Sequence, residues 1–333
     1  MGCCNSSTKY SPEELNQRLL ECFDSDSPKR LEYYISLKYR DHKKEDFNID
    51  TFTLKTSLGQ ELNLLGLSML YGKLEFIKLI HELHKGSFVE MEKCLNKFGY
   101  SGLRLICENN YLEVFEYYSG VYIGCKESIT NEYCSRVKDL CVLGKDPSSL
   151  KFLQKNPECK FSPIHYACVY GNISIIKAIS SFASTLTEVP LEFDTNYIEE
   201  GQGYNCALIA CKRGNYNMIK FLNNACKADF ALLTKNKESC LQVLFSGATD
   251  APMTELYNCL VYLVEKVKVD IRHNYEEVLT QCEIFKVTDY YIQKLIESGI
   301  DLKKSELEEK CKKTKIARFG SFTESKFTDL VFK

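Results

Sequence analysis

The stretch from Phe161 to Ser181 decides the fold, and it reads Phe-Ser-Pro-Ile-His-Tyr-Ala-Cys-Val-Tyr-Gly-Asn-Ile-Ser-Ile-Ile-Lys-Ala-Ile-Ser-Ser. Ser162 and Pro163 are typical of a helix start, because a hydroxyl caps a free amide and proline suits the first helical turn. Gly171 favours a stop, since glycine adopts left-handed backbone without strain. Isoleucines then recur at helical spacing, at positions 173, 175, 176 and 179. The sequence predicts two short helices, and neither buries its apolar stripe without neighbours.

This stretch resembles an ankyrin repeat. In that family a Thr-Pro-Leu-His-x-Ala-Ala-x-x-Gly-His element opens the first helix of each repeat, and residues 162–172 match it almost position by position. A second copy follows, where the segment Cys-Lys-Arg-Gly-Asn at 211–215 repeats Cys-Val-Tyr-Gly-Asn at 168–172. The resemblance implies an all-α fold, an ankyrin-type solenoid of about seven to eight helix pairs with irregular loops. It also implies that His165 hydrogen-bonds the backbone and braces adjacent repeats.

The same pattern predicts helix pairs along most of the chain. They are expected at residues 12–37, 63–83, 101–118, 134–153, 161–181, 205–222, 239–264 and 278–296. Residues 40–58 are charged and rich in threonine, and we expect a loop there. Residues 183–203 form a long acidic connection, which is either a functional loop or an insertion tolerated between repeats. The predicted repeat domain spans residues 12–302.

The chain departs from the repeat pattern at both ends. Residues 1–11 precede the first predicted helix, and residues 303–333 follow the last repeat as a polar helix and tail. Ser321 stands three residues after Arg318, a short pattern that basophilic kinases use and that also arises by chance. The tail's aromatic residues either fold back on the last repeat or engage a partner. These aromatic residues are Phe319, Phe322, Phe327 and Phe332.

The N-terminus carries a lipidation pattern. Removal of Met1 exposes Gly2, and Ser6 satisfies the hydroxyl position of the myristoylation motif. Cys3 and Cys4 are then candidates for palmitoylation. Because one myristoyl chain binds membranes only marginally, a second acyl chain is needed for stable attachment. We therefore expect a lipid-anchored protein at the cytoplasmic face of a membrane; the alternative is an unmodified tail on a cytoplasmic protein.

Composition narrows the classes of partner and location. The chain has 333 residues, 44% of them hydrophobic, and a formal net charge of -2. This balance gives no basic field for nucleic acid. No apolar run approaches the length of a membrane span, and no secretory signal region follows Met1. We expect a folded protein on the cytosolic side of a cell, without a nucleic-acid partner.

The seventeen cysteines are predicted to be packing residues rather than disulfides or metal ligands. No oxidising compartment is signalled, and no Cys-x-x-Cys pair occurs in the sequence. Several cysteines fall instead at the small second-alanine site of the repeat, where a free thiol behaves as a small hydrophobe. These are Cys107, Cys141, Cys168, Cys211 and Cys282. We expect no metal site and no cofactor.

The sequence lacks the motifs of common enzymes. It has no phosphate-binding loop, no Gly-x-Ser-x-Gly elbow and no His-Glu-x-x-His helix. A cysteine nucleophile paired with His165 stays open as an alternative, because cysteine is abundant in this chain. The favoured prediction is a protein without catalysis and without a small-molecule substrate.

Residues before the turn of each pair are the predicted partner-binding surface. In ankyrin arrays these positions lie on the exposed concave side, so the resemblance implies the same here. They are Leu70 with Tyr71, Val142 with Leu143, Val169 with Tyr170, and Lys212 with Arg213; Glu108 and Asn109 occupy the same place in the third pair. Apolar groups along a groove favour protein binding, unless loops or the tail cover them. The predicted function is a membrane-tethered scaffold or adaptor, and a soluble subunit or inhibitor of a cytosolic assembly is the alternative.

Overall fold

The computed structural model describes residues 10–38, 49, 52–55, 61–84, 102–124, 161–184, 193–248, 251–281, 285–300 and 302. These residues are mostly helical, which confirms the all-α class in its coarse form. The chain divides into two compact units, residues 1–209 and residues 210–333.

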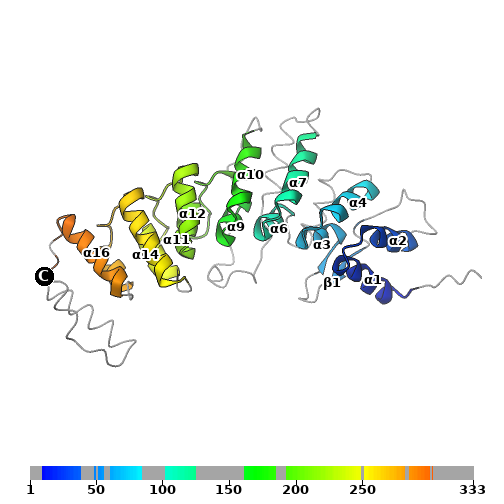
Figure 1. Ribbon diagram of the computed structural model, residues 1–333, viewed down its shortest axis with the longest axis horizontal. Helices are drawn as coiled ribbons and strands as arrows, with labels where there is room; N and C mark the ends of the chain where they lie inside the picture. Colours follow the sequence, from blue (N-terminus) through cyan, green and yellow to red (C-terminus); the bar gives the residue numbers. More distant parts are fainter. Residues whose placement is uncertain are drawn as a thin grey trace, which may run out of the picture. The chain divides into compact units, whose positions relative to one another are not determined.

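Helices of the first unit come in pairs (Figure 1). The pairs are α1 (Pro12–Asp24) with α2 (Pro28–Lys38), α3 (Leu64–Leu70) with α4 (Leu74–His84), α6 (Gly102–Asn109) with α7 (Leu112–Gly124), and α9 (Pro163–Tyr170) with α10 (Ile173–Ala183). Two short strands, β1 (Leu54–Lys55) and β2 (Glu61–Leu62), pair antiparallel. Strand β1 lies within the predicted loop at 40–58, so the loop prediction is wrong for its two residues, which alternate buried and exposed.

Successive pairs of the first unit pack helix against helix. Helix α6 contacts both α3 and α9, while α7 contacts both α4 and α10. The predicted fourth pair at 134–153 lies outside the described residues. Apolar stripes of the second helices supply the core. Of the predicted stripe on α10, Ile175, Ile176 and Ile179 are buried and Ile173 is half-buried. The equivalent residues Phe76, Ile77, Ile80, Val114 and Phe115 are also buried.

Each turn between paired helices uses left-handed backbone, as the sequence predicts. The φ angles are 63° at Gly72, 60° at Asn110 and 76° at Gly171. The next pair then caps the carbonyls that each first helix leaves unpaired. The hydroxyl of Tyr111 donates to the carbonyl of Leu70 at 3.0 Å. The amide of Asn172 donates to Cys107 at 2.7 Å and to Glu108 at 3.1 Å, which ties α9 and α10 to α6.

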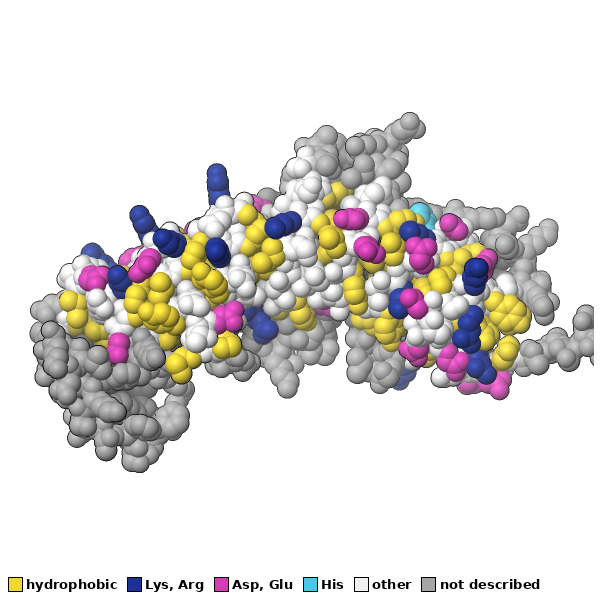
Figure 2. Space-filling view, viewed as in Figure 1, with side chains coloured by type: hydrophobic (Ala, Val, Ile, Leu, Met, Phe, Trp, Pro, Cys, Tyr) yellow, Lys and Arg dark blue, Asp and Glu magenta, His cyan; other side chains and the backbone are white. Residues whose placement is uncertain are grey.

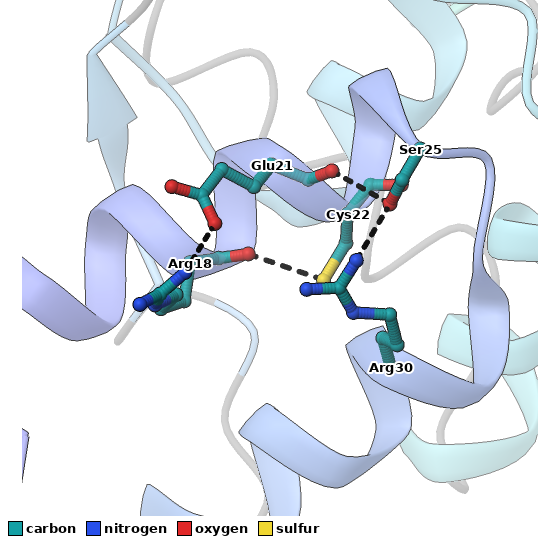
Figure 3. A network of polar contacts seen from close by, with 5 residues as sticks. All are labelled: Arg18, Glu21, Cys22, Ser25 and Arg30. Atoms are coloured by element: carbon teal, nitrogen blue, oxygen red, sulfur yellow. Dashed lines mark hydrogen bonds and ion pairs between the residues drawn. The ribbon is translucent and has the colours of Figure 1, made fainter.

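The first pair is joined by a polar network between α1 and α2 (Figure 3). The Sγ of Cys22 donates to the Arg18 carbonyl at 3.1 Å, and the hydroxyl of Ser25 donates to the Glu21 carbonyl at 2.8 Å. From α2, a guanidinium nitrogen of Arg30 donates to the Ser25 hydroxyl at 3.4 Å. These bonds satisfy carbonyls at the end of α1 and fix the chain where it turns back.

The second unit repeats the paired arrangement after α11 (Cys206–Arg213), within which the unit boundary falls. Its further α-helices are α12 (Tyr216–Phe221), α13 (Cys240–Gly247), α14 (Met253–Tyr262), α15 (Tyr275–Gln281) and α16 (Phe285–Glu297). Two short π-helices, η5 (Leu222–Cys226) and η6 (Leu263–Val267), directly continue α12 and α14. Helix α14 contacts α12 and α16, and α13 contacts α15. Here too, first helices pack on first helices and second on second.

Three second helices of this unit end in a closing turn with one left-handed residue. After η5, Lys227 adopts a φ of 52°, and the N–H of Ala228 donates back to the Leu222 carbonyl at 3.1 Å. After η6, Lys268 adopts a φ of 61° and Val269 donates to Leu263 at 3.2 Å. Gly299 is also left-handed after α16, with a φ of 85°, but there the N–H of Ile300 donates five residues back, to Leu295, at 3.1 Å. The two lysine turns could not be predicted from the repeat pattern, because lysine stands where the pattern expects glycine.

We expect glycine to stabilise the two closing turns in which lysine is left-handed. Left-handed backbone is strained for lysine but not for glycine, so Lys227→Gly and Lys268→Gly should each raise the free energy of unfolding by about 1 kcal/mol. Urea unfolding followed by far-UV circular dichroism measures the change. Lys220→Gly, at an exposed position inside α12, is the control and should lower stability by about 1 kcal/mol. If all three variants lose stability alike, the strain argument is wrong.

Candidate functional site

His165 holds the start of α9 and the connection that follows α10. Its Nδ1 lies 3.3 Å from the backbone nitrogen of Ser162, and its Nε2 lies 3.0 Å from the carbonyl oxygen of Tyr197. Because the Ser162 N–H needs an acceptor, Nδ1 is unprotonated and the proton is on Nε2, which donates to Tyr197. The side chain is fully buried, and burial lowers the pKa of His165 to about 4. A neutral imidazole with both nitrogens in hydrogen bonds supports the expected role of His165 in bracing adjacent segments.

Gln242 makes the same two kinds of bond in the second unit. Its Oε1 accepts the N–H of Ser239 at 2.9 Å, as Nδ1 of His165 does at the start of α9. Its Nε2 donates to the Glu277 carboxylate of α15 at 2.6 Å. Glutamine thus supplies the acceptor and donor that histidine supplies, at the third residue of the first helix. Gln242 could not be predicted from the repeat pattern, because the family has histidine at this position.

Glu199 organises the connection that presents the carbonyl of Tyr197. Its carboxylate is fully buried and accepts three backbone N–H groups, at 2.6 Å from Gly201, 2.5 Å from Gln202 and 3.2 Å from Tyr204. The N–H of Glu199 donates in turn to the Tyr204 carbonyl at 2.9 Å. A buried carboxylate therefore gives the acidic connection a structural role that neither predicted alternative included.

The predicted binding surface needs one correction. Tyr71 and Tyr170 are exposed, at 40% and 41%, and Leu70 is half-buried. Val169, however, is only 3% exposed, so its prediction as a surface residue is wrong. Helix α9 packs against both α6 and α10, which leaves a narrower exposed face than the pattern assumed. Val142 and Leu143 lie outside the described residues.

Polar members of the surface differ in how much they reach solvent. Asn109 is exposed, and its amide donates to the Leu105 carbonyl at 2.8 Å, while Glu108 is half-buried. In the second unit, Arg213 is exposed and the methylene stem of Lys212 lies directly over Gly247. An alanine at 247 would collide with that stem. The structure therefore leaves two tyrosines on the first unit and one arginine on the second as the best exposed members.

The remaining predicted site residues lie outside the described part of the chain. Gly2, Cys3 and Cys4 belong to this group, as do Cys141 and Cys282. Among the described residues, no helix has the length and apolarity needed to cross a membrane. The same residues hold no group of three or more His, Cys, Asp or Glu side chains arranged to bind a metal ion.

The described cysteines at the small-residue site are buried, as predicted. Cys107, Cys168 and Cys211 are each fully buried. Burial raises the pKa of the thiols of Cys107 and Cys211 well above the ordinary value, and raises that of Cys259 to about 12. The thiolate is the reactive form of cysteine, so these groups are poor nucleophiles.

Thiol labelling checks this prediction residue by residue. In the native full-length chain, Cys226 is half-buried and should react with an excess of iodoacetamide at least tenfold faster than Cys107 or Cys211. Peptide mass spectrometry after timed quenching measures each rate, and the same reaction in urea is the control for intrinsic reactivity. Rapid native labelling of Cys168, which lies on α9 with His165, would instead revive the cysteine-enzyme alternative.

A scan of protein-family models and a search of curated proteins both return no match for this chain. The function therefore has to be argued from the residues and contacts above.

Proposed function

We propose that this protein is an ankyrin-type, lipid-anchored scaffold that binds another protein and catalyses no reaction. The observation that carries the ankyrin assignment is the equivalence of His165 and Gln242. Each accepts the N–H of the residue that caps its helix and donates to a group about one repeat further along the chain. The repeated closing turns at Lys227, Lys268 and Gly299 add independent support. Each compact unit is then a run of such repeats.

The binding surface is built from the ends of first helices. Tyr71 closes α3 and Tyr170 ends α9, so the two aromatic side chains occupy equivalent places in their pairs. Tyrosine and arginine are enriched in protein interfaces, because they combine a large apolar area with polar groups. Arg213 ends α11 in the same way. We assign Tyr71 and Tyr170 to the binding surface of the first unit and Arg213 to a separate one on the second unit, and we exclude Val169, which is buried.

The N-terminal motif supplies the anchor in this proposal. Myristate on Gly2 and palmitate on Cys3 or Cys4 would together hold the chain stably at a cytoplasmic membrane face. Tethering raises the local concentration of a partner that is also at the membrane, so a modest affinity of the repeat surface suffices. The soluble subunit or inhibitor uses the same surface without acylation, and the acylation state of Gly2 separates the two candidates.

A surface variant tests the protein-binding claim. We compare the full-length protein with a variant carrying Tyr71→Glu and Tyr170→Glu. The amount of partner protein that co-purifies specifically should fall at least tenfold, because charge at both positions opposes burial in an interface. Quantitative mass spectrometry after purification from the same cells measures the loss. Tyr33→Glu is the matched control, since Tyr33 is 52% exposed on α2 and does not end a first helix. An unchanged set of bound proteins would refute this placement.

A further inference from the structure

The second unit carries a groove that the proposed binding surface does not use. It lies between α14 and α16, has a volume of about 910 Å³, and is lined by Met253, Tyr257, Asp289, Tyr290, Ile296 and Glu297 among others. In Figure 2, hydrophobic side chains gather over these two helices. Since both are second helices of their pairs, this groove is separate from the ends of the first helices.

Large apolar side chains line the groove together with the carboxylates of Asp289 and Glu297, which are called its rim below. Met253 is 53% exposed and Ile296 is 52% exposed, although both are large hydrophobic side chains. The rings of Tyr257 and Tyr290 meet edge to face, with centroids 5.7 Å apart. Among the residues that the structure describes, the lining includes Asp289 and Glu297 but no lysine or arginine. Exposed apolar groups beside carboxylates favour a ligand that is both apolar and basic.

The charge of the rim is only partly neutralised from outside the groove. Lys294 lies 2.9 Å from Glu297 and 3.8 Å from Glu265, so one ammonium serves two carboxylates. The hydroxyl of Tyr290 also donates to Glu265 at 3.0 Å. No ion pair of Asp289 with a cation is found among the described residues. A cationic occupant would therefore meet net negative charge at this rim.

The chain itself contains a segment of matching chemistry. Residues 310–322 read Lys-Cys-Lys-Lys-Thr-Lys-Ile-Ala-Arg-Phe-Gly-Ser-Phe, with five cations, no carboxylate and three large apolar side chains. We propose that this segment occupies the groove of the second unit, with Phe319 and Phe322 against its apolar side chains and the cations near the carboxylates. The occupant is thus an internal ligand, and a second copy or another protein is an alternative that the experiment distinguishes.

The length of the intervening chain allows this contact. Leu302 is the last described residue, five residues beyond the end of α16, and thirteen residues lie between it and Ile316. Extended backbone of that length spans about 45 Å. Helix α16 has 13 residues and is only about 20 Å long, so the segment reaches any part of the groove. A short tether also gives a local concentration in the millimolar range, so weak individual contacts suffice for binding.

Photocrosslinking in the full-length protein tests this occupant. The photoreactive residue p-benzoylphenylalanine replaces Tyr257, which is 37% exposed, and replaces Tyr33 in a control protein. Irradiation should join position 257 to a peptide within residues 310–322 in the same molecule, at a yield independent of protein concentration. The control probe at position 33 should give no such product.

Substitutions in the tail and at the rim complete the test. Phe319→Ala with Phe322→Ala should lower the crosslink yield at least fivefold, and Asp289→Asn should lower it at least twofold. Phe327→Ala with Phe332→Ala, outside the segment, should leave the yield unchanged. Circular dichroism confirms that each variant is folded. A crosslink to a second copy or to another protein, no crosslink, or a yield insensitive to Phe319 and Phe322 overturns the proposal, and none of these outcomes bears on Tyr71 or Tyr170.

Discussion

Glu199→Ala should lower the free energy of unfolding by about 3 kcal/mol. The substitution leaves the N–H groups of Gly201, Gln202 and Tyr204 without their acceptor. Each buried N–H without an acceptor costs about 1–3 kcal/mol. Water that enters the vacated space can accept from some of the three donors, so the total loss is smaller than the sum of three such costs. The connection also presents the carbonyl that His165 uses, so the loss should spread to the start of α9. Urea unfolding monitored by circular dichroism measures it.

Two further variants identify the cause of the loss at Glu199. Glu200→Ala is the matched control, because Glu200 is the neighbouring carboxylate and is exposed; its effect should stay within about 0.5 kcal/mol. Glu199→Gln keeps the shape but turns an amide N–H₂ toward backbone donors, so it should recover no more than about half of the loss. Full recovery by glutamine would mean that packing, rather than hydrogen bonding to the carboxylate, stabilises this turn.

The second large effect is an acid dependence of stability that comes from His165. Its pKa is about 4 in the folded chain and 6.5 when unperturbed, because burial disfavours the charged imidazolium. Between these values the unfolded chain binds the proton and the folded chain does not, so stability rises with pH. The contribution is fully present above about pH 6.5 and is lost as the pH falls toward 4, by about 3 kcal/mol in total.

Gln242 suggests the control for this acid dependence. Because Gln242 accepts and donates in the same pattern, His165→Gln should fold at pH 7 with a change of no more than about 1 kcal/mol. Between pH 6.5 and 4, the unfolding free energy of the variant should fall less steeply with decreasing pH than that of the wild type, because the variant lacks the contribution of His165. Comparing the two proteins cancels groups common to both, including His81, whose pKa burial also lowers. Parallel curves for the two proteins would show that His165 does not titrate as its burial requires.

Local signals predicted the parts of the fold that short segments decide. Ser162 is the N-cap residue of α9 and Pro163 is its first residue, as the sequence predicted. Gly171 adopts the left-handed turn expected of it. These features depend on backbone sterics and on hydrogen bonds within a few residues, so a single sequence reveals them.

Features set by contacts between distant residues could not be predicted. Val169 is buried because α9 packs on α6 and α10, which no spacing along one helix reveals. The direct contact of α6 with α9 likewise depends on chain brought together in space. The roles of Glu199 and Gln242 depend on donors that tertiary structure places around them. Lys227 was missed for another reason, since tertiary context forces lysine into backbone that glycine prefers.

Intact-mass analysis of the full-length protein from eukaryotic cells tests the central claim most directly. The claim is that the repeat array works at a membrane, held there by Gly2 together with Cys3 or Cys4. The wild-type protein should carry one myristoyl and at least one palmitoyl group and should float with vesicles, whereas Gly2→Ala should carry neither and stay with the unbound protein. Wild-type protein with an unmodified Gly2 that does not float would contradict the account.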